Sequence, residues 1–336
     1  MKKLKGKVIL FIAPKFFDYE LEIKKELEIF GAKVFYFNER PDDNFFTKVL
    51  IRLNFKKLIQ KYIDYYYQNI IKLTQDEKID YLFLVSPETI DTEKIIKIKN
   101  KHKNIKIYTY LWDSVRNKKS LELLPESDIF FTFDSADRKI DYKIKFLPLF
   151  YINDYTDAAN IQTDFLYDIS FIGTIHSDRY TILKKIDSFA SKNNLRTFLY
   201  FYSPSKALFF FQKLFLKDFR NIDKNDIHFK SLDKSEIINI IKKSKALVDI
   251  QHPSQDGLTM RTIEVLGAKR KLITTNKKIL EYDFYDKNNI HVFERDYLDL
   301  DLDLDFFKNA FTNIDENIYE KYSIRNWLKK IFETGE

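Results

Sequence analysis

Short apolar runs alternate with helical patterns along the whole chain. VILFIA (residues 8–13) and YLFLV (residues 81–85) are continuous apolar runs, typical of parallel strands buried on both faces. Residues 20–30 carry apolar side chains at helical spacing and end at Gly31, a common helix terminator. This alternation predicts an α/β protein with doubly wound sheets. Further strands are expected at residues 33–37, 106–111, 129–133, 145–149, 167–172, 195–202, 227–229, 246–250, 272–275 and 290–293.

The pattern weakens between residues 148 and 164, where Asn, Asp and Thr replace periodic apolar positions. Loss of periodicity in a polar stretch predicts a linker. We therefore expect one domain over residues 1–150 and a second over 151–315. An amphipathic helix over 324–332 is expected in a final segment, 316–336.

Composition narrows the class of protein. With 336 residues, 45% of them hydrophobic and 32% charged, the chain can form two globular domains. It has no cysteine, which excludes disulfides, thiolate metal sites and a cysteine nucleophile, and fits a reducing cytoplasm. The first apolar run is too short for a signal peptide, because Pro14, Lys15 and Asp18 follow it. No stretch reaches the roughly 20 apolar residues of a membrane helix, so we expect no membrane span.

The net charge of +7 and the 32 Phe and 21 Tyr favour either an anionic partner, nucleic acid or lipid, or simply the residue usage of an AT-rich genome. The lysines are spread over the chain among 50 acidic residues, which argues against a nucleic-acid face.

The chemistry concentrates in residues 246–276, which read as strand, loop, helix, strand. In parallel sheets such a loop lies at the carboxyl end of a strand, where ligands bind. The helix start that follows it offers unpaired N–H groups to an anion such as a diphosphate. Arg261 and Glu264 lie on one face of this helix. They form either an anion clamp with a hydroxyl acceptor, suited to a sugar nucleotide, or a surface ion pair.

A second loop has the same character. The expected strand at 167–172 is followed by GTIHSDR, in which Gly173 and Thr174 precede a helix and Arg179 lies at the helix start. A glycine and a small polar residue between a strand and a helix are typical of phosphate-binding loops.

These two segments resemble the donor domain of GT-B glycosyltransferases, in the form found in bacterial capsule, lipopolysaccharide and CgeB-like enzymes. The matching stretches are GLTMRTIEVLGAKRKLITTN and DISFIGTIHSDRY, and YLWDS at 110–114 is a further match. The resemblance implies two Rossmann-like parallel-sheet domains facing a cleft, with the C-terminal helix crossing back to the first domain. It implies that Glu264 binds the ribose and Arg261 the diphosphate.

The resemblance also implies which other residues contact the donor. These are Gly173, Thr174, Arg179, His252, Gly257, Leu258 and Thr259. Many retaining members carry a second Glu seven residues before the ribose Glu, where this chain has Gly257 beside Asp256. Inversion or retention of the sugar configuration therefore stays open.

A base for the acceptor hydroxyl is expected from the first domain. Asp113, in YLWDS, is either this base or a helix N-cap. Asp18 is the second choice, Asp134 lies at another strand end, and His252 is a further cleft residue.

We expect no metal and no cofactor, with the nucleotide sugar as a substrate. Five histidines without H-x-x-x-H, no calcium loop and no D-x-D at a strand end give no metal motif, and P-loop and serine-elbow motifs are missing too. The sequence thus predicts a metal-independent glycosyltransferase acting on a glycan or lipid-linked acceptor. The alternatives are a nucleic-acid-binding protein and a non-catalytic sugar-nucleotide-binding protein.

Two amphipathic stretches bear on location. Residues 44–73 either lie in a membrane interface or pack on the first sheet, and residues 207–219 either dock on a membrane surface or pack between domains. We expect a cytoplasmic protein, with the inner face of the membrane as its place of work. The alternating LDLDLDLDF at 298–306 fits a strand or an exposed loop equally.

Overall fold

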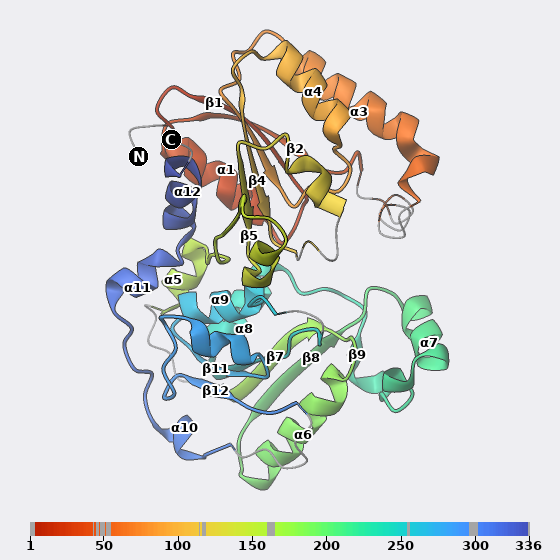
Figure 1. The fold of residues 1–336 in the computed structure, drawn as a ribbon. Helices are drawn as coiled ribbons and strands as arrows, with labels where there is room; N and C mark the ends of the chain where they lie inside the picture. The colour runs from red at the N-terminus through yellow and green to blue at the C-terminus, as the bar shows by residue number, and fades with distance from the viewer. Residues whose placement is uncertain are drawn as a thin grey trace. The chain divides into compact units, whose positions relative to one another are not determined.

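The computed structural model describes residues 4–42, 55–113, 119–159, 165–253, 256–295 and 302–334, and the single residues 44, 47, 51 and 115. The chain forms two compact units (Figure 1). Unit 1 combines Met1–Leu149 with Ile324–Glu336, and unit 2 is Phe150–Ser323.

Unit 1 is built on a parallel sheet, of six strands in the described part, in the order β2-β1-β3-β4-β5-β6. Reversal of the strand order at β1 is the doubly wound pattern expected from the sequence. The strands are β1 Val8–Ala13, β2 Lys33–Asn38, β3 Tyr81–Val85, β4 Lys106–Leu111, β5 Ile129–Thr132 and β6 Ile144–Phe146. The helices and 3₁₀ turns are α1 Tyr19–Ile29, η2 Lys56–Ile59, α3 Gln60–Leu73, α4 Thr92–Lys101, η4 Lys119–Leu123, η5 Ser135–Lys139 and α12 Ile324–Glu333.

Alternate side chains of these strands enter different cores, which is why the strands are apolar throughout. Leu82 and Leu84 belong to the core formed with α3 and α4. Phe83, between them, packs instead against Trp327 and Phe332 of α12, with ring centroids 6.0 and 5.5 Å apart.

The C-terminal helix therefore crosses back to unit 1, as the resemblance implied. An ion pair between Arg325 Nε and Glu26 Oε1, 2.7 Å apart, adds to the aromatic packing of α12. The returning segment begins at Ile324, and α11 (Glu316–Lys321), inside the expected final segment, stays in unit 2.

Unit 2 repeats the architecture, with strand order β12-β11-β10-β7-β8-β9, again all parallel and six-stranded in the described part. The strands are β7 Tyr167–Thr174, β8 Thr197–Tyr202, β9 Ile227–His228, β10 Ser244–Asp249, β11 Lys271–Thr274 and β12 Ile290–Val292. The other elements are α5 Asn153–Ala159, α6 Arg179–Lys192, α7 Lys206–Phe215, η6 Lys217–Phe219, η7 Lys224–Asp226, α8 Lys234–Lys242, α9 Met260–Gly267, η8 Lys277–Glu281 and α10 Asp305–Lys308.

Helix α5 corrects the expectation of a structureless linker at 148–164. It is short, but it buries Tyr155 and Ala158 and packs on α8 and α9. A seven-residue helix is too short for a visible periodic pattern, and tertiary packing stabilises it.

Arg270 connects three helices of unit 2. Its buried guanidinium donates to the backbone O of Ala158 at the end of α5, of Lys242 at the end of α8 and of Ala268 after α9, at 3.3, 3.2 and 3.0 Å. The last carbonyls of a helix lack partners within the helix and carry the negative end of its dipole. One cation thus satisfies carbonyls at three helix ends.

Two expectations about long segments change. Residues 44–73 do not form one helix, because Phe55 is non-helical and η2 precedes α3. Ile63, Tyr67 and Ile70 of α3 are buried in unit 1, which supports packing on the sheet. Most of residues 43–54 lie outside the described residues. The same holds for 296–301, which contain part of the alternating stretch at 298–306. The end of that stretch belongs to α10, which begins at Asp305.

Candidate functional site

The predicted donor residues gather where β7 and β10 end, next to each other in the sheet of unit 2. Asp249, the last residue of β10, fixes the entry to α9. Its Oδ2 accepts from Thr259 Oγ1 at 2.5 Å and from Thr262 Oγ1 at 2.7 Å. Thr259 in turn caps α9 by accepting from the Thr262 N–H. The helix start that was expected to receive an anion is therefore held rigidly to the strand end.

Arg261 and Glu264 form an ion pair on this helix, with Nη1 and Oε2 2.6 Å apart. The Glu264 side chain is only 9% exposed and that of Arg261 is 18% exposed. This burial excludes the alternative of a solvent-exposed surface pair. A buried carboxylate oriented by an arginine is suited to accept hydroxyl hydrogen bonds.

The loop between β10 and α9 is held from the neighbouring strand end. Asn276, after β11, donates through Nδ2 to the backbone O of Asp256 and of Gly257, both at 3.3 Å. Gly257 and Leu258 are buried, whereas His252 and Asp256 are exposed. Of the predicted residues on this loop, His252 is the one whose side chain is open to solvent.

Arg179 ties the β7 and β10 loops together. It donates through Nη1 to the Thr174 backbone O at 2.8 Å and through Nε to the Ile250 backbone O at 3.0 Å. Its guanidinium also lies over the Phe171 ring. Burial lowers the pKa of Arg179 to about 10; Asp249 opposes the shift, while Arg295 and Arg261 add to it. Arg179 therefore stays cationic near neutral pH. It lies close enough to Arg261 and Arg295 for their positive charges to act on its pKa.

Gly173 has a packing role here. A Cβ at this position would lie 2.8 Å from the Phe171 ring and 3.3 Å from Arg179 Nη1. The missing side chain therefore leaves room for Arg179, and the backbone of Gly173 itself shows no left-handed conformation. Thr174 beside it is exposed.

Arg295 is a site residue that sequence reasoning missed. It follows β12, two strands away from β10, and its Nη1 lies 2.5 Å from Asp178 Oδ1 at the start of α6. Its Nη2 donates to the Gln251 backbone O at 2.5 Å. The signal for it was its position just after a strand, since the carboxyl ends of parallel strands meet at one edge of the sheet.

His176 is the second residue that the sequence did not single out. Its ring lies 5.4 Å from that of His252. Burial, together with the charges of Arg179, His252 and Arg295, lowers the pKa of His176 to about 3. His176 is therefore neutral at physiological pH, when one ring nitrogen donates and the other accepts.

The acidic candidates of unit 1 follow β1 and β4. Asp18 is exposed and has a left-handed backbone, φ 63°, as does Phe17 before it. Asp113 accepts from Ser86 Oγ at 3.5 Å, and Ser86 too has a positive φ of 48°. The Phe16 and Trp112 rings lie 5.7 Å apart, so the two loops adjoin. Strained backbone of this kind clusters at functional sites.

Asp134, the further candidate after β5, caps a 3₁₀ turn. It is buried and caps η5 by accepting from the Ala136 N–H at 3.0 Å. Within the described residues, His, Asp and Glu form no group that could hold a metal ion. No helix among these described residues has the length and apolarity needed to cross a bilayer.

The sequence matches no protein-family model and no curated protein. Solved structures are similar over nearly the whole chain. A glycosyltransferase from Rickettsia africae has a TM-score of 0.58 at 14% identity, covering 98% of this chain and 97% of its own. HepE of Anabaena, in complex with UDP and glucose, has 0.57 at 8% identity, covering 97% and 98%.

The lipopolysaccharide outer-core galactosyltransferase WaaB has a TM-score of 0.52 at 13% identity, covering 98% of this chain and all of its own. At these identities the likeness concerns the fold. Together with the two doubly wound parallel sheets and the returning C-terminal helix, it shows that the chain has the GT-B fold.

Proposed function

We propose that this chain is a glycosyltransferase that moves a sugar from a nucleotide-sugar donor to a glycan acceptor. The observation that carries the proposal is the cluster at the carboxyl edge of the unit 2 sheet: Arg179, Arg261 and Arg295 with the buried Glu264 of α9. The similar HepE structure holds UDP and glucose, and WaaB is a galactosyltransferase, which supports this reading.

The chemistry follows from the charges. Breaking the bond between sugar and diphosphate leaves negative charge on the diphosphate, which fixed cations and N–H groups stabilise. Arg261 and the first N–H groups of α9 are our proposed diphosphate ligands, with Thr174, Gly257, Leu258 and Thr259 beside them. Because guanidinium groups supply the positive charge, we propose that transfer needs no metal.

Glu264 is the proposed ligand of the ribose hydroxyls. We propose that neutral His176 and exposed His252 hydrogen-bond the sugar or a phosphate oxygen. In unit 1, Asp113 is our first choice and Asp18 our second for the base that takes the proton of the acceptor hydroxyl.

The test begins with thermal shifts in UDP, GDP, CMP, ADP and dTDP. A nucleotide at about 100 times its dissociation constant adds roughly 2.7 kcal/mol to the stability. We expect one of them to raise the melting temperature. The corresponding nucleotide sugar should then release its nucleotide when a glycan acceptor is present, equally well with a chelator. Absence of any shift would overturn the proposal.

Asp113→Asn separates an enzyme from a non-catalytic binding protein of the same fold. We expect this variant to bind the nucleotide normally and to lose transfer by about 100-fold or more, the usual contribution of a general base. Unchanged transfer in both Asp113→Asn and Asp18→Asn would contradict the assigned role. A nucleic-acid-binding protein would instead bind oligonucleotides with a steep dependence on salt.

We further propose that the acceptor is lipid-linked and that the enzyme works at the inner face of the membrane. The support is α7, which projects from unit 2 in Figure 1. Phe210, Phe211, Leu214, Phe215 and Leu216 are each between 46% and 69% exposed. Lys206, Lys217 and Arg220 flank them. Exposed aromatic and aliphatic side chains bordered by cations fit an anionic bilayer surface.

Phe211→Glu with Phe215→Glu should weaken binding to phosphatidylglycerol vesicles about tenfold or more, because two apolar anchors become anions. Sedimentation with vesicles measures this. Leu73→Glu with Tyr142→Glu, two exposed apolar positions of unit 1, is the matched control and should leave binding unchanged. Equal binding by both double variants would contradict the role of α7.

A further inference from the structure

A cavity of about 380 Å³ lies at the opposite edge of the unit 2 sheet. It is lined by Lys245, near the start of β10, and by Lys271, the first residue of β11. The proposed donor ligands follow the carboxyl ends of β7 and β10, at the other edge of the sheet. Phe307 and Lys308 of α10 also line the cavity. Its volume is within the range of pockets that hold small molecules.

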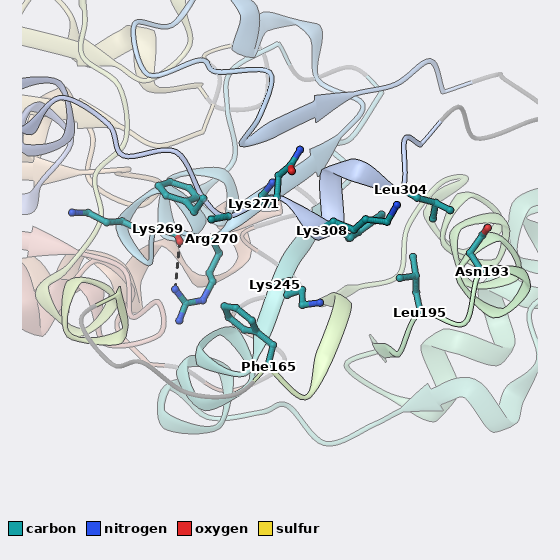
Figure 2. A pocket seen from close by; sticks show the side chains of 13 residues that line it. Phe165, Asn193, Leu195, Lys245, Lys269, Arg270, Lys271, Leu304 and Lys308 are labelled. Carbon is teal, nitrogen blue, oxygen red and sulfur yellow. Dashed lines mark hydrogen bonds between the residues drawn. The ribbon is translucent and has the colours of Figure 1, made fainter.

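The charge of this cavity is one-sided. Its cations include Lys245, Arg270, Lys271 and Lys308, and none of the described residues that line it is acidic. Lys245 and Lys308 each have one carboxylate partner outside the lining, Asp168 at 2.7 Å and Asp305 at 2.8 Å. Figure 2 shows both lysines on the side nearer Asn193 and Leu195, while the ammonium of Lys269 lies at the far end.

The two buried cations of the lining donate hydrogen bonds to backbone carbonyl groups. Lys271 is buried, and its Nζ donates to the Phe306 backbone O at 2.6 Å. Arg270 is more than nine-tenths buried and its Nε, among the described residues, has no hydrogen-bond partner. Burial lowers the pKa of both groups. Asp286 opposes the shift at Lys271, but the hydrogen bonds of both cations go to uncharged carbonyl groups. A buried positive charge with neutral hydrogen-bond partners is stabilised further by an anion.

Much of the remaining lining is apolar, although Asn193 and Asn309 also belong to it. Phe165, Leu195, Leu304, Phe307 and Phe311 border the same space as the cations. A free inorganic ion would leave these side chains in contact with water. A ligand with an anionic head and a small apolar body would contact both kinds of lining.

We propose that this cavity is a second binding site, separate from the donor site, for an amphipathic organic anion. Such a ligand is a phosphate or carboxylate attached to a ring or short chain. Its head would be held by Lys245 and Lys308, with the Nε of Arg270 as a further donor, and its apolar part by Phe165 and Leu195.

Phenyl phosphate is the probe, titrated into the full chain by calorimetry, with inorganic phosphate and phenol as the two partial ligands. The double variant Lys245→Ala with Lys308→Ala removes the two solvent-accessible cations proposed to bind the anionic head. The variant Leu195→Trp fills the cavity without changing its charge. Lys57→Ala with Lys61→Ala, exposed positions of unit 1, is the charge-matched control. Nucleotide binding, measured in parallel, reports that each variant is folded.

We expect phenyl phosphate to bind more tightly than either partial ligand. Each lysine removed should weaken it by about tenfold, the order of one charge-assisted hydrogen bond. Leu195→Trp should abolish binding, and the control should leave it unchanged. The proposal is overturned if phenyl phosphate does not bind, if the lysine variant binds it as well as the wild type, or if inorganic phosphate or phenol binds equally tightly.

Discussion

Glu264→Gln should weaken the binding of the nucleoside diphosphate by roughly 100-fold, because two hydrogen bonds to a charged acceptor, each about 1.5–3 kcal/mol, are lost or reduced. Glutamine keeps the shape of the side chain at this buried position. Asp256→Asn, an exposed carboxylate on the preceding loop, is the matched control and should bind normally. Calorimetric titration with the nucleotide identified by thermal shift measures the change.

The Glu264→Gln variant also loses the ion pair with Arg261, which by itself could disturb the site. A second ligand separates this general effect from the loss of the ribose contact. The 2′-deoxy form of the same nucleotide lacks one of the hydroxyls that Glu264 is proposed to bind. Wild type should discriminate between the two nucleotides and Glu264→Gln should not, a coupling that general damage does not produce. Equal discrimination by both proteins would refute the ribose role of Glu264.

Arg270→Met should lower the free energy of unfolding of unit 2 by about 3–5 kcal/mol, because three buried helix-end carbonyls lose their donor. At roughly 2–4 °C per kcal/mol for a domain of this size, the melting temperature should fall by about 6 °C or more. Arg270→Lys keeps the charge, but one ammonium cannot replace the planar fork, so it should be intermediate.

Arg196→Met is the matched control for this stability change. Arg196, another arginine of unit 2, pairs with Asp168, but its side chain is 56% exposed, and exposed pairs contribute about 0–1 kcal/mol. Its melting temperature should stay close to that of the wild type by scanning calorimetry. A fall as large as that of Arg270→Met, or no fall in Arg270→Met, would contradict a specific role of Arg270 at the three helix ends.

Local sequence determined the elements of this protein. Continuous apolar runs such as YLFLV gave buried parallel strands, and Gly31, with φ 90°, ended α1 as expected. The three-residue spacing of Arg261 and Glu264 predicted their contact, because residues three apart share a helix face. The loops after β7 and β10 could also be recognised from local sequence, because strand, turn and helix start follow one another in the chain.

Tertiary structure decided what depends on strand order and packing. Arg295 joins the site because β12, β11, β10 and β7 lie side by side, an order that no local pattern encodes. Burial turned Arg261 and Glu264 from a candidate surface pair into a buried one, and made Arg179 a tie between two loops. Short α5 and the role of Arg270 also depend on contacts between distant segments. Spacing along the chain specifies neighbours on one element, whereas only the packed sheet brings the ends of different strands together.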